Sequence, residues 1–276
     1  DEARMARWHV NLFARDDCAA RPEALSARHW DDGYEVYAHG DSVFLQGYGA
    51  FVERLAEGLD IVLDSPVCRI RYGPDGVAVE TENGTHHAAR AIVTLPLGVL
   101  KRGAVDFDPP LPAEKTDAIA RLGFGVLEKV GLRFDHPFWD AHTYVFGVAD
   151  GHETGEPTCV VNCASVLGQP LLVLLYGGEA GLQMAALSEE AARDRAMATL
   201  RRMFGSDIPS PRAIHRTGWS RDPFAWGAYG YVAVGATPAD FAALAAPVGD
   251  RLYFAGEATH PTQWAAAHGA YLSGLR

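Results

Sequence analysis

The chain has no apolar run long enough to cross a membrane, and it is short of positive charge. Its longest apolar stretch, Pro170 to Tyr176, has the length of a buried strand, whereas a membrane helix needs roughly 20 apolar residues. The formal net charge of −11 argues against a nucleic-acid surface and would favour a cationic small substrate, although solubility explains it more simply. With 276 residues, 48% of them hydrophobic, the chain can bury a core in one or two domains. We expect neither a membrane nor a nucleic-acid partner.

Cysteine is also scarce, and no C-x-x-C pair is present. The four cysteines are Cys18, Cys68, Cys159 and Cys163. The last two stand four positions apart in an apolar, strand-like segment, where alternation would place them on one face. We interpret the cysteines as buried free thiols, which fits a reducing cytoplasm. Because the first residue is Asp1, the lack of a signal peptide says little about location.

The sequence also lacks histidines, cysteines and carboxylates at the spacing of a metal site. His260 and His268 lie near each other in sequence, but no H-x-x-x-H pattern or suitably spaced carboxylate accompanies them. We therefore expect no metal site.

What the chain does have is a glycine-acid turn near its C-terminal end. Arg251-Leu-Tyr-Phe-Ala-Gly-Glu257 reads as a short buried strand followed by a turn, and a small-residue helix start follows at His268-Gly-Ala270. Open α/β sheets bind cofactors at the carboxyl ends of their strands. Glycine allows backbone to approach a ligand closely, and a helix start offers unpaired N–H groups. The pattern indicates a cofactor site.

The remaining pattern alternates strands and helices. Gly73-Pro-Asp-Gly76 and Asn83-Gly84 are hairpin turns, so a meander is expected over 68–81 and beyond. Ser188 to Arg202 is the clearest helix, with a serine cap, early acids, late arginines and Gly205 beyond its end. Tyr176-Gly-Gly is expected to turn a strand into a loop. Further helices are predicted over 50–58 and 111–122, and further strands over 89–95, 126–134, 159–165 and 171–176.

Several segments, in order along nearly the whole chain, match one family. The segments are Asp60-Ile-Val-Leu with Val67, Thr94-Leu-Pro-Leu-Gly-Val-Leu-Lys101, Phe107-Asp-Pro-Pro-Leu-Pro, Gly123-Phe-Gly-Val-Leu-Glu-Lys129-Val, Phe138-Trp139-Asp140, Trp219 with Asp222-Pro223, Tyr229-Gly-Tyr231 and Phe254-Ala-Gly-Glu257. On these segments the sequence resembles the flavin-containing amine oxidases, which include polyamine oxidases, monoamine oxidases and the flavin-type histone lysine demethylases.

The resemblance implies an α/β fold in which an FAD-binding, Rossmann-like domain interleaves with a substrate domain of mixed sheet and helices. Residues 36–125 and 239–276 would form part of the FAD domain, and residues 1–35 and 126–238 the substrate domain. The family's opening βαβ unit with its G-x-G-x-x-G turn has no counterpart here. The chain is therefore expected to be a C-terminal portion or fragment, or to be completed by a second chain.

Lys129 is the first candidate catalytic residue. Alternation places it with Leu127 and Gly131, on the face opposite Glu128 and Val130. Taken alone it is a solvated lysine on an edge strand. By resemblance it holds a water at flavin N5, and a desolvated lysine would suit proton transfer.

An aromatic-rich run supplies the next candidates. Aromatic residues usually pack in cores. By resemblance, however, Tyr229 forms a catalytic wall of a cage for the substrate amine, and Trp219 packs near the flavin and substrate. Phe224 replaces a frequent tryptophan. Ala228 stands where monoamine oxidases carry the cysteine that bonds the flavin, so FAD is expected to be non-covalent.

Ala266 would form the opposite wall of the cage. Its small side chain resembles that of polyamine oxidases and demethylases rather than monoamine oxidases, which predicts long or bulky amine substrates. The cofactor contacts implied by the resemblance are Val67, Thr94, Pro96, Trp219, Phe224, Ala228, Gly256, Glu257, Ala266, Ala267 and Ala270. Without the resemblance, Val67 and Pro96 are ordinary strand and turn residues.

The resemblance thus implies an FAD-dependent amine oxidase. Hydride would pass from the carbon beside the amine nitrogen to flavin N5, the imine would hydrolyse, and dioxygen would yield hydrogen peroxide. Polyamine-type substrates are favoured. An L-amino-acid oxidase, a histone-demethylase-like enzyme and a non-catalytic fragment or subunit remain alternatives.

Overall fold

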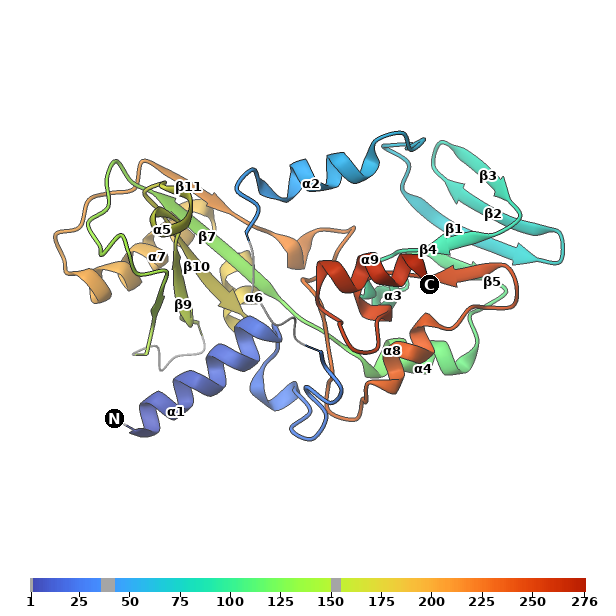
Figure 1. Cartoon of the computed structure of the whole chain (residues 1–276), viewed down its shortest axis with the longest axis horizontal. Coiled ribbons are helices and arrows are strands. Elements are labelled where there is room, and N and C mark those ends of the chain that lie inside the picture. The colour runs from blue at the N-terminus through green and yellow to red at the C-terminus, as the bar shows by residue number, and fades with distance from the viewer. Residues whose placement is uncertain (1, 36–42, 150–154) are drawn as a thin grey trace.

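The computed structural model describes residues 2–35, 43–149 and 155–276. Figure 1 shows two lobes, with a five-stranded sheet in one and the C-terminal helix in the other. The mixed α/β fold expected from the sequence is confirmed. The expected domain boundary after residue 35 adjoins residues 36–42, which lie outside the described residues.

The first lobe is built on an antiparallel sheet. The resemblance implies a mixed sheet here, but every pairing is antiparallel. The strand order is β11 (Ala213–Arg216), β7 (Leu127–Arg133), β10 (Leu171–Gly177), β9 (Cys159–Asn162) and β8 (Val145–Gly147). Adjacent antiparallel strands need only short connections, and the segment between β9 and β10 holds only a five-residue helix.

Helix α7 (Glu189–Phe204) covers this sheet as the sequence predicts. The Ser188 hydroxyl accepts the N–H of Ala191 at 3.2 Å, and Gly205 follows the last turn. The buried residues of α7, among them Ala196 and Leu200, share one hydrophobic cluster with β7 and β10. Removing this apolar surface from water is the main force that holds helix and sheet together.

The second lobe contains the predicted meander. Strands β1 (Val67–Gly73), β2 (Gly76–Thr81) and β3 (Gly84–Ala88) pair antiparallel, and β5 (Asp106–Asp108) adds parallel to β1. Beside them, β4 (Ala91–Val93) pairs parallel with β13 (Leu252–Phe254), although they are 161 residues apart at their starts. This parallel pair carries the glycine-acid turn at its carboxyl end.

Two short strands and several helices complete the fold. β6 (Gly123–Phe124) pairs with β12 (Gly230–Tyr231) and joins the lobes. The helices not yet named are α1 (Glu2–Asn11), the π-helix η1 (Leu12–Asp17), η2 (Pro22–Ala24), α2 (Gly47–Ala56), α3 (Leu97–Arg102), α4 (Ala113–Arg121), α5 (Cys163–Leu167), α6 (Glu179–Ala186), η3 (Trp219–Arg221), α8 (Ala239–Ala245), η4 (Glu257–Thr259) and α9 (Ala267–Leu275).

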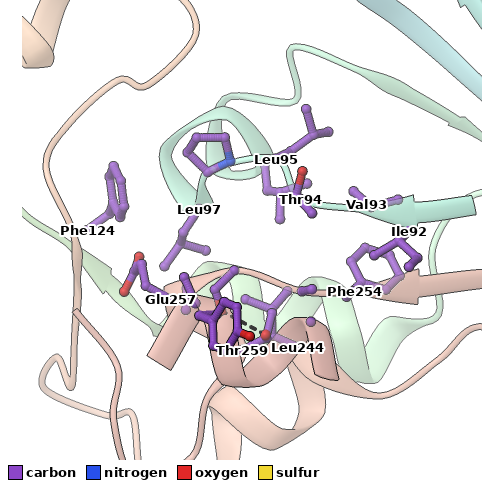
Figure 2. Close-up of a pocket in the computed structure, with 18 of the residues that line it drawn as sticks. Ile92, Val93, Thr94, Leu95, Leu97, Phe124, Leu244, Phe254, Glu257 and Thr259 are labelled. Atoms are coloured by element: carbon purple, nitrogen blue, oxygen red, sulfur yellow. Dashed lines mark hydrogen bonds between the residues drawn. The ribbon is translucent and has the colours of Figure 1, made fainter. Parts of the chain in front are cut away.

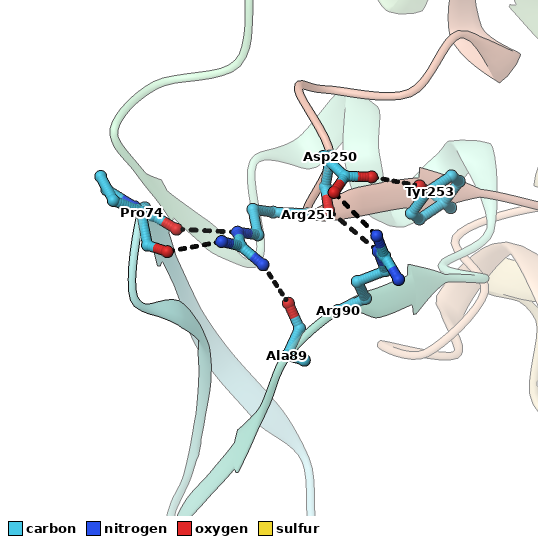
Figure 3. Close-up of polar contacts among 7 residues, drawn as sticks. Pro74, Ala89, Arg90, Asp250, Arg251 and Tyr253 are labelled. Carbon is cyan, nitrogen blue, oxygen red and sulfur yellow. Dashed lines mark hydrogen bonds and ion pairs between the residues drawn. The ribbon is translucent and has the colours of Figure 1, made fainter.

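A polar cluster fastens the meander to the parallel pair (Figure 3). The Arg251 guanidinium donates to the carbonyls of Gly73, Pro74 and Ala89 at 3.2, 2.5 and 3.2 Å. Beside it Arg90 and Asp250 form an ion pair of 2.7 Å. Because the guanidinium carries several donors in a fixed plane, one side chain joins three backbone segments.

The two expected domains share a core. Leu97 and Leu122, from the expected FAD domain, pack in one buried cluster with Val232 and Ala236, from the expected substrate domain. The domain limits themselves stay a prediction.

Four local predictions differ from the structure. The strand expected over 159–165 ends at Asn162, whose side chain accepts the N–H of Ala164 and starts α5, so Cys159 and Cys163 do not share a strand face. Of the four free cysteines only Cys159 is buried. Tyr176-Gly-Gly leads into helix α6 rather than a loop, and β4 is shorter than 89–95.

Candidate functional site

A cavity of about 740 Å³ lies at the carboxyl ends of β4 and β13 (Figure 2). Phe124 and Glu257 lie toward one end, and Ile92 and Phe254 toward the other. Helix α9 contributes Ala270 and Leu275 to its wall. Parallel strands that end together leave such a crevice, because each chain turns away to a different helix. The other lining residues are Val93, Thr94, Leu95, Pro96, Leu97, Leu100, Ala228, Leu244, Ala255, Gly256, Ala258, Thr259, Tyr271 and Gly274.

Several of the predicted cofactor residues meet in this cavity. They come from β4 and its following turn, from the segment before β12, and from the turn and helix after β13. They are Thr94, Pro96, Ala228, Gly256, Glu257 and Ala270. The cavity wall does not include Val67, Trp219, Phe224, Ala266 or Ala267.

Gly256 has the backbone conformation that its place requires. Its φ of +127° is one that L side chains rarely adopt, and a Cβ there would meet nothing within 4 Å. Its N–H donates to the Ser273 hydroxyl at 2.8 Å, which ties the end of β13 to α9. The glycine therefore leaves backbone exposed to the cavity at a fixed position.

The start of α9 lies beside this turn. Ala266 is its extended N-cap residue, with φ −125° and ψ 142°, and Ala267 is its first helical residue. Gly269 is required because a Cβ there would lie 1.9 Å from the carbonyl oxygen of Gln263. The close approach brings the 263–266 segment against the helix.

Glu257 contributes an acidic group to the cavity wall. Burial raises the pKa of its carboxyl to about 7, partly opposed by hydrogen bonds from the N–H groups of Ala265 and Gly230. The group therefore titrates near neutral pH.

Lys129 and Trp219 lie in neighbouring segments. The Lys129 N–H donates to the Thr217 hydroxyl at 2.9 Å, and its carbonyl accepts the Thr217 N–H at 3.1 Å. Its side chain is exposed and forms no hydrogen bond or ion pair with the described residues. The expectation of an edge strand is wrong, because β7 is paired with β11 on one side and β10 on the other. Trp219 and Phe224 are also exposed.

Glu128, on the opposite face of β7, anchors the segment that carries Trp219. It is 1% exposed, and its carboxylate accepts the hydroxyls of Thr217 and Ser220 at 2.6 and 2.7 Å. It also accepts the N–H groups of Trp219 and Ser220 at 3.3 and 2.9 Å. A buried carboxylate with four donors fixes a loop firmly. The burial of Glu128 could be predicted from the sequence, because strand alternation places it on the same face as Val130 and Leu132.

Tyr229 and Ala228 are held against β6. Gly125 donates its N–H to the Tyr229 carbonyl, and its carbonyl accepts the Ala228 N–H, both at 2.8 Å. The Tyr229 hydroxyl donates to the backbone carbonyl of Asp16. Burial raises the pKa of Tyr229, so the hydroxyl stays protonated as a donor.

Asp16 is a buried acid that the sequence did not reveal. Burial raises the pKa of its carboxyl to about 6. Oδ2 accepts the Thr158 hydroxyl and, at 3.2 Å, the Cys159 thiol, whereas Oδ1 is buried without a partner. Nothing around Asp16-Asp17-Cys18 in sequence indicates this setting, because its partners are 142 and more residues away.

The family model described as flavin containing amine oxidoreductase matches residues 4–276. The chain belongs to the flavin-containing amine oxidoreductase family. The resemblance predicted from its ordered segments is thereby confirmed.

The curated relatives that it matches are longer proteins. It is 39% identical over its whole length to lysine-specific histone demethylase 1 homolog 1 of Oryza sativa subsp. japonica, and 42% identical to the Arabidopsis thaliana protein of that description. The chain spans 33% of the length of each.

Solved amine oxidase structures share the fold. Putrescine oxidase bound to putrescine has a TM-score of 0.78 and 22% identity, and the similarity covers 98% of this chain and 63% of that one. At this identity the likeness shows the fold alone.

The family implies a flavin cofactor, and the cavity fits part of one. Its volume lies within the range of cofactor sites, roughly 300–1,000 Å³. Its lining is largely apolar, which suits the ring system, and an added Cβ at Gly256 or Gly274 would meet nothing within 4 Å. No lysine or arginine is among the residues lining it, so this wall offers no side-chain cation for a pyrophosphate.

The described residues hold neither a metal site nor a membrane span. No group of three or more histidine, cysteine or acidic side chains within 2–35, 43–149 and 155–276 is arranged to hold a metal ion. Over the same residues, no helix combines the length and apolarity needed to cross a membrane.

Proposed function

We propose that this chain is the catalytic portion of an FAD-dependent amine oxidase. The observation that carries the proposal is the meeting of Thr94, Pro96, Ala228, Gly256, Glu257 and Ala270 around one apolar cavity at the ends of the parallel pair. These residues come from three parts of the sequence, near 94–96, at 228 and over 256–270, and the resemblance assigned each of them to the cofactor. Their meeting supports the assignment.

Each residue would have a defined role. Gly256 and the start of α9 would present backbone to the flavin, and the apolar wall would exclude water. When bound, the flavin would accept hydride from the carbon next to the amine nitrogen, and dioxygen would then restore it with formation of hydrogen peroxide. Lys129 would hold a proton or a water at the reacting edge. Ala228 has no group that can bond to a flavin, so we propose non-covalent binding.

Long amines are the proposed substrates, with polyamines first. Ala266 is small and only half-buried, which would leave a passage beside the cage. The Tyr229 ring would contact the cationic or neutral amine, since an aromatic face attracts cations. The net charge of −11 would favour the approach of a polycation.

A second candidate substrate is a methylated lysine side chain on a peptide. The observation that favours it is the identity of 38–42% to several proteins described as lysine-specific histone demethylases. Both candidates need the open wall at Ala266, so the choice between them is experimental.

We further propose that a polypeptide segment outside these 276 residues completes the cofactor site. Ile92, Tyr271 and Leu275 line the cavity yet are 64%, 53% and 68% exposed. Helix α2 and the residues after it also expose Val52, Leu55 and Leu59 among others. Exposed apolar surface of this extent usually marks an interface. The cavity wall also lacks a lysine or arginine that could bind the pyrophosphate, and the additional segment would supply that group.

The experiment is a flavin assay on the chain alone and on the whole reading frame that encodes it. We expect the whole product to be yellow, to release free FAD on denaturation, and to lose its colour when an amine is added without oxygen. Spermidine and a dimethyl-lysine peptide would be compared as substrates. A whole product that is colourless, or whose flavin no amine reduces, would overturn the proposal and favour a non-catalytic subunit.

A further inference from the structure

Glu257 connects the two segments that carry the expected cage walls. Its carboxylate accepts the Gly230 N–H at 3.1 Å on Oε1 and 3.3 Å on Oε2. Oε2 also accepts the Ala265 N–H at 2.7 Å. Gly230 directly follows Tyr229, and Ala265 directly precedes Ala266. One side chain therefore bridges the backbone next to both walls.

The bridged backbone is constrained on both sides. Ala265 has φ +61°, a left-handed conformation that is unfavourable for a residue with a Cβ. Such a conformation persists where surrounding contacts enforce it, and the short hydrogen bond to Glu257 is one of them. A Cβ on Gly230 would lie 3.3 Å from Oε2 and 3.4 Å from the Phe241 ring. The carboxylate therefore fits closely against a glycine.

The carboxylate is committed to this bridge. It forms no ion pair with the described residues, and two backbone segments supply all of its hydrogen bonds. It lies at the cavity wall in Figure 2, close to Phe124, whose β6 strand pairs with the strand of Gly230. Loss of this carboxylate would therefore first affect the backbone positions of the two wall segments.

We propose that Glu257 is a positioning residue that fixes the distance between the Tyr229 and Ala266 segments, and so sets the width of the amine passage. The inference rests on the proposed amine oxidase function. It assigns to the side chain a role distinct from the cofactor contact that the resemblance implies. The backbone of the Gly256-Glu257 turn, rather than the Glu257 side chain, would then contact the flavin.

The bridge itself can be tested without catalysis. Hydrogen–deuterium exchange would be followed in peptides that contain Gly230 and Ala265, for wild type, Glu257→Gln and Glu257→Ala. Exchange is measured at alkaline pH, above the Glu257 pKa of about 7, where the acceptor is charged. A hydrogen bond to a charged acceptor contributes about 1.5–3 kcal/mol, so we expect exchange at both amides to quicken by about tenfold or more in Glu257→Ala. The Glu257→Gln variant, which keeps one acceptor oxygen, should lie between. Glu82→Gln, at an exposed turn, is the control.

The functional arm compares a slim and a bulky amine on the flavin-loaded whole product. Glu257→Ala should change the ratio of kcat/KM for the two amines by about tenfold, and Glu257→Gln should restore most of it. If Glu257→Ala does not fold, Glu257→Asp, which is one methylene shorter, takes its place. Unchanged exchange at both amides, or a kcat/KM ratio within about twofold of wild type, would overturn the inference. A wild type without flavin would instead defeat the proposed function.

Discussion

The Tyr229 hydroxyl donates a hydrogen bond to the backbone carbonyl of Asp16, across 213 positions of sequence. The ring proposed as a cage wall is thereby fixed by the π-helix at the start of the chain. Because Asp16 also accepts hydrogen bonds from Thr158 and Cys159, the wall is connected to the start of strand β9 in the five-stranded sheet.

The first prediction separates the ring of Tyr229 from its hydroxyl. Tyr229→Phe keeps the ring but leaves the Asp16 carbonyl without this donor, so we expect a loss of about 1–3 kcal/mol in the free energy of unfolding. Turnover should fall less than in Tyr229→Ala, which removes the ring. Tyr231→Phe is the control, since its hydroxyl has no hydrogen bond in the described structure. Equal stability of the two phenylalanine variants in urea unfolding would contradict the assignment.

The second prediction concerns the anchor at Glu128. Glu128→Gln removes the charge that four donors share, and we expect the free energy of unfolding to fall by about 1.5–3 kcal/mol. Because the anchored loop carries the exposed Trp219, acrylamide quenching of tryptophan fluorescence should also change. Glu82→Gln should alter neither quantity. An unchanged urea midpoint for Glu128→Gln would show that the loop is held by other contacts.

The third prediction tests Lys129. Its side chain is exposed and unpaired in the described structure, so Lys129→Met should change the free energy of unfolding by less than about 0.5 kcal/mol. If Lys129 handles a proton at the reacting edge, turnover or reoxidation should slow by about 10²-fold or more. Arg133→Met, also outward on β7 and hydrogen-bonded to Gln169, controls the rate measurement for the loss of a surface cation. Stopped-flow rates equal to wild type would remove Lys129 from the mechanism.

The fourth prediction tests the open wall. Ala266 has an extended backbone that any residue adopts, so Ala266→Tyr should fold. The added ring should lower kcat/KM for long or bulky amines by about tenfold or more, because a filled pocket discriminates by size. Ala242→Tyr, on an exposed part of α8, controls for an added tyrosine. Undiminished use of spermidine by Ala266→Tyr would refute the open passage.

Local patterns predicted the parts of the fold that depend on neighbours in sequence. Ser188 caps α7 and Lys129 points outward from β7, because caps and strand alternation are properties of a few consecutive residues. The end of β9 was not predictable in this way. Asn162 leaves the strand because its side chain also donates to the carbonyls of Asp140, Ala141 and Thr143.

The candidate site depends on contacts between distant parts of the chain, so local sequence patterns could not predict which residues meet there. The local glycine-acid pattern indicated a cofactor site at Gly256, whereas Thr94 was assigned through the family resemblance. The parallel pairing of β4 with β13 brings the two to one cavity. Asp16 and Phe124 were not foreseen, since their partners lie on distant segments. The bridge at Glu257 joins residues 27 and 8 positions away, a combination that no local pattern encodes.

The most direct measurement is the visible spectrum of the whole product of the reading frame, recorded without oxygen before and after an amine is added. The account predicts a bound, non-covalent flavin whose absorption bleaches with amine and returns with air, together with hydrogen peroxide. A colourless protein, or a flavin that polyamines and methyl-lysine peptides leave oxidised, would contradict it.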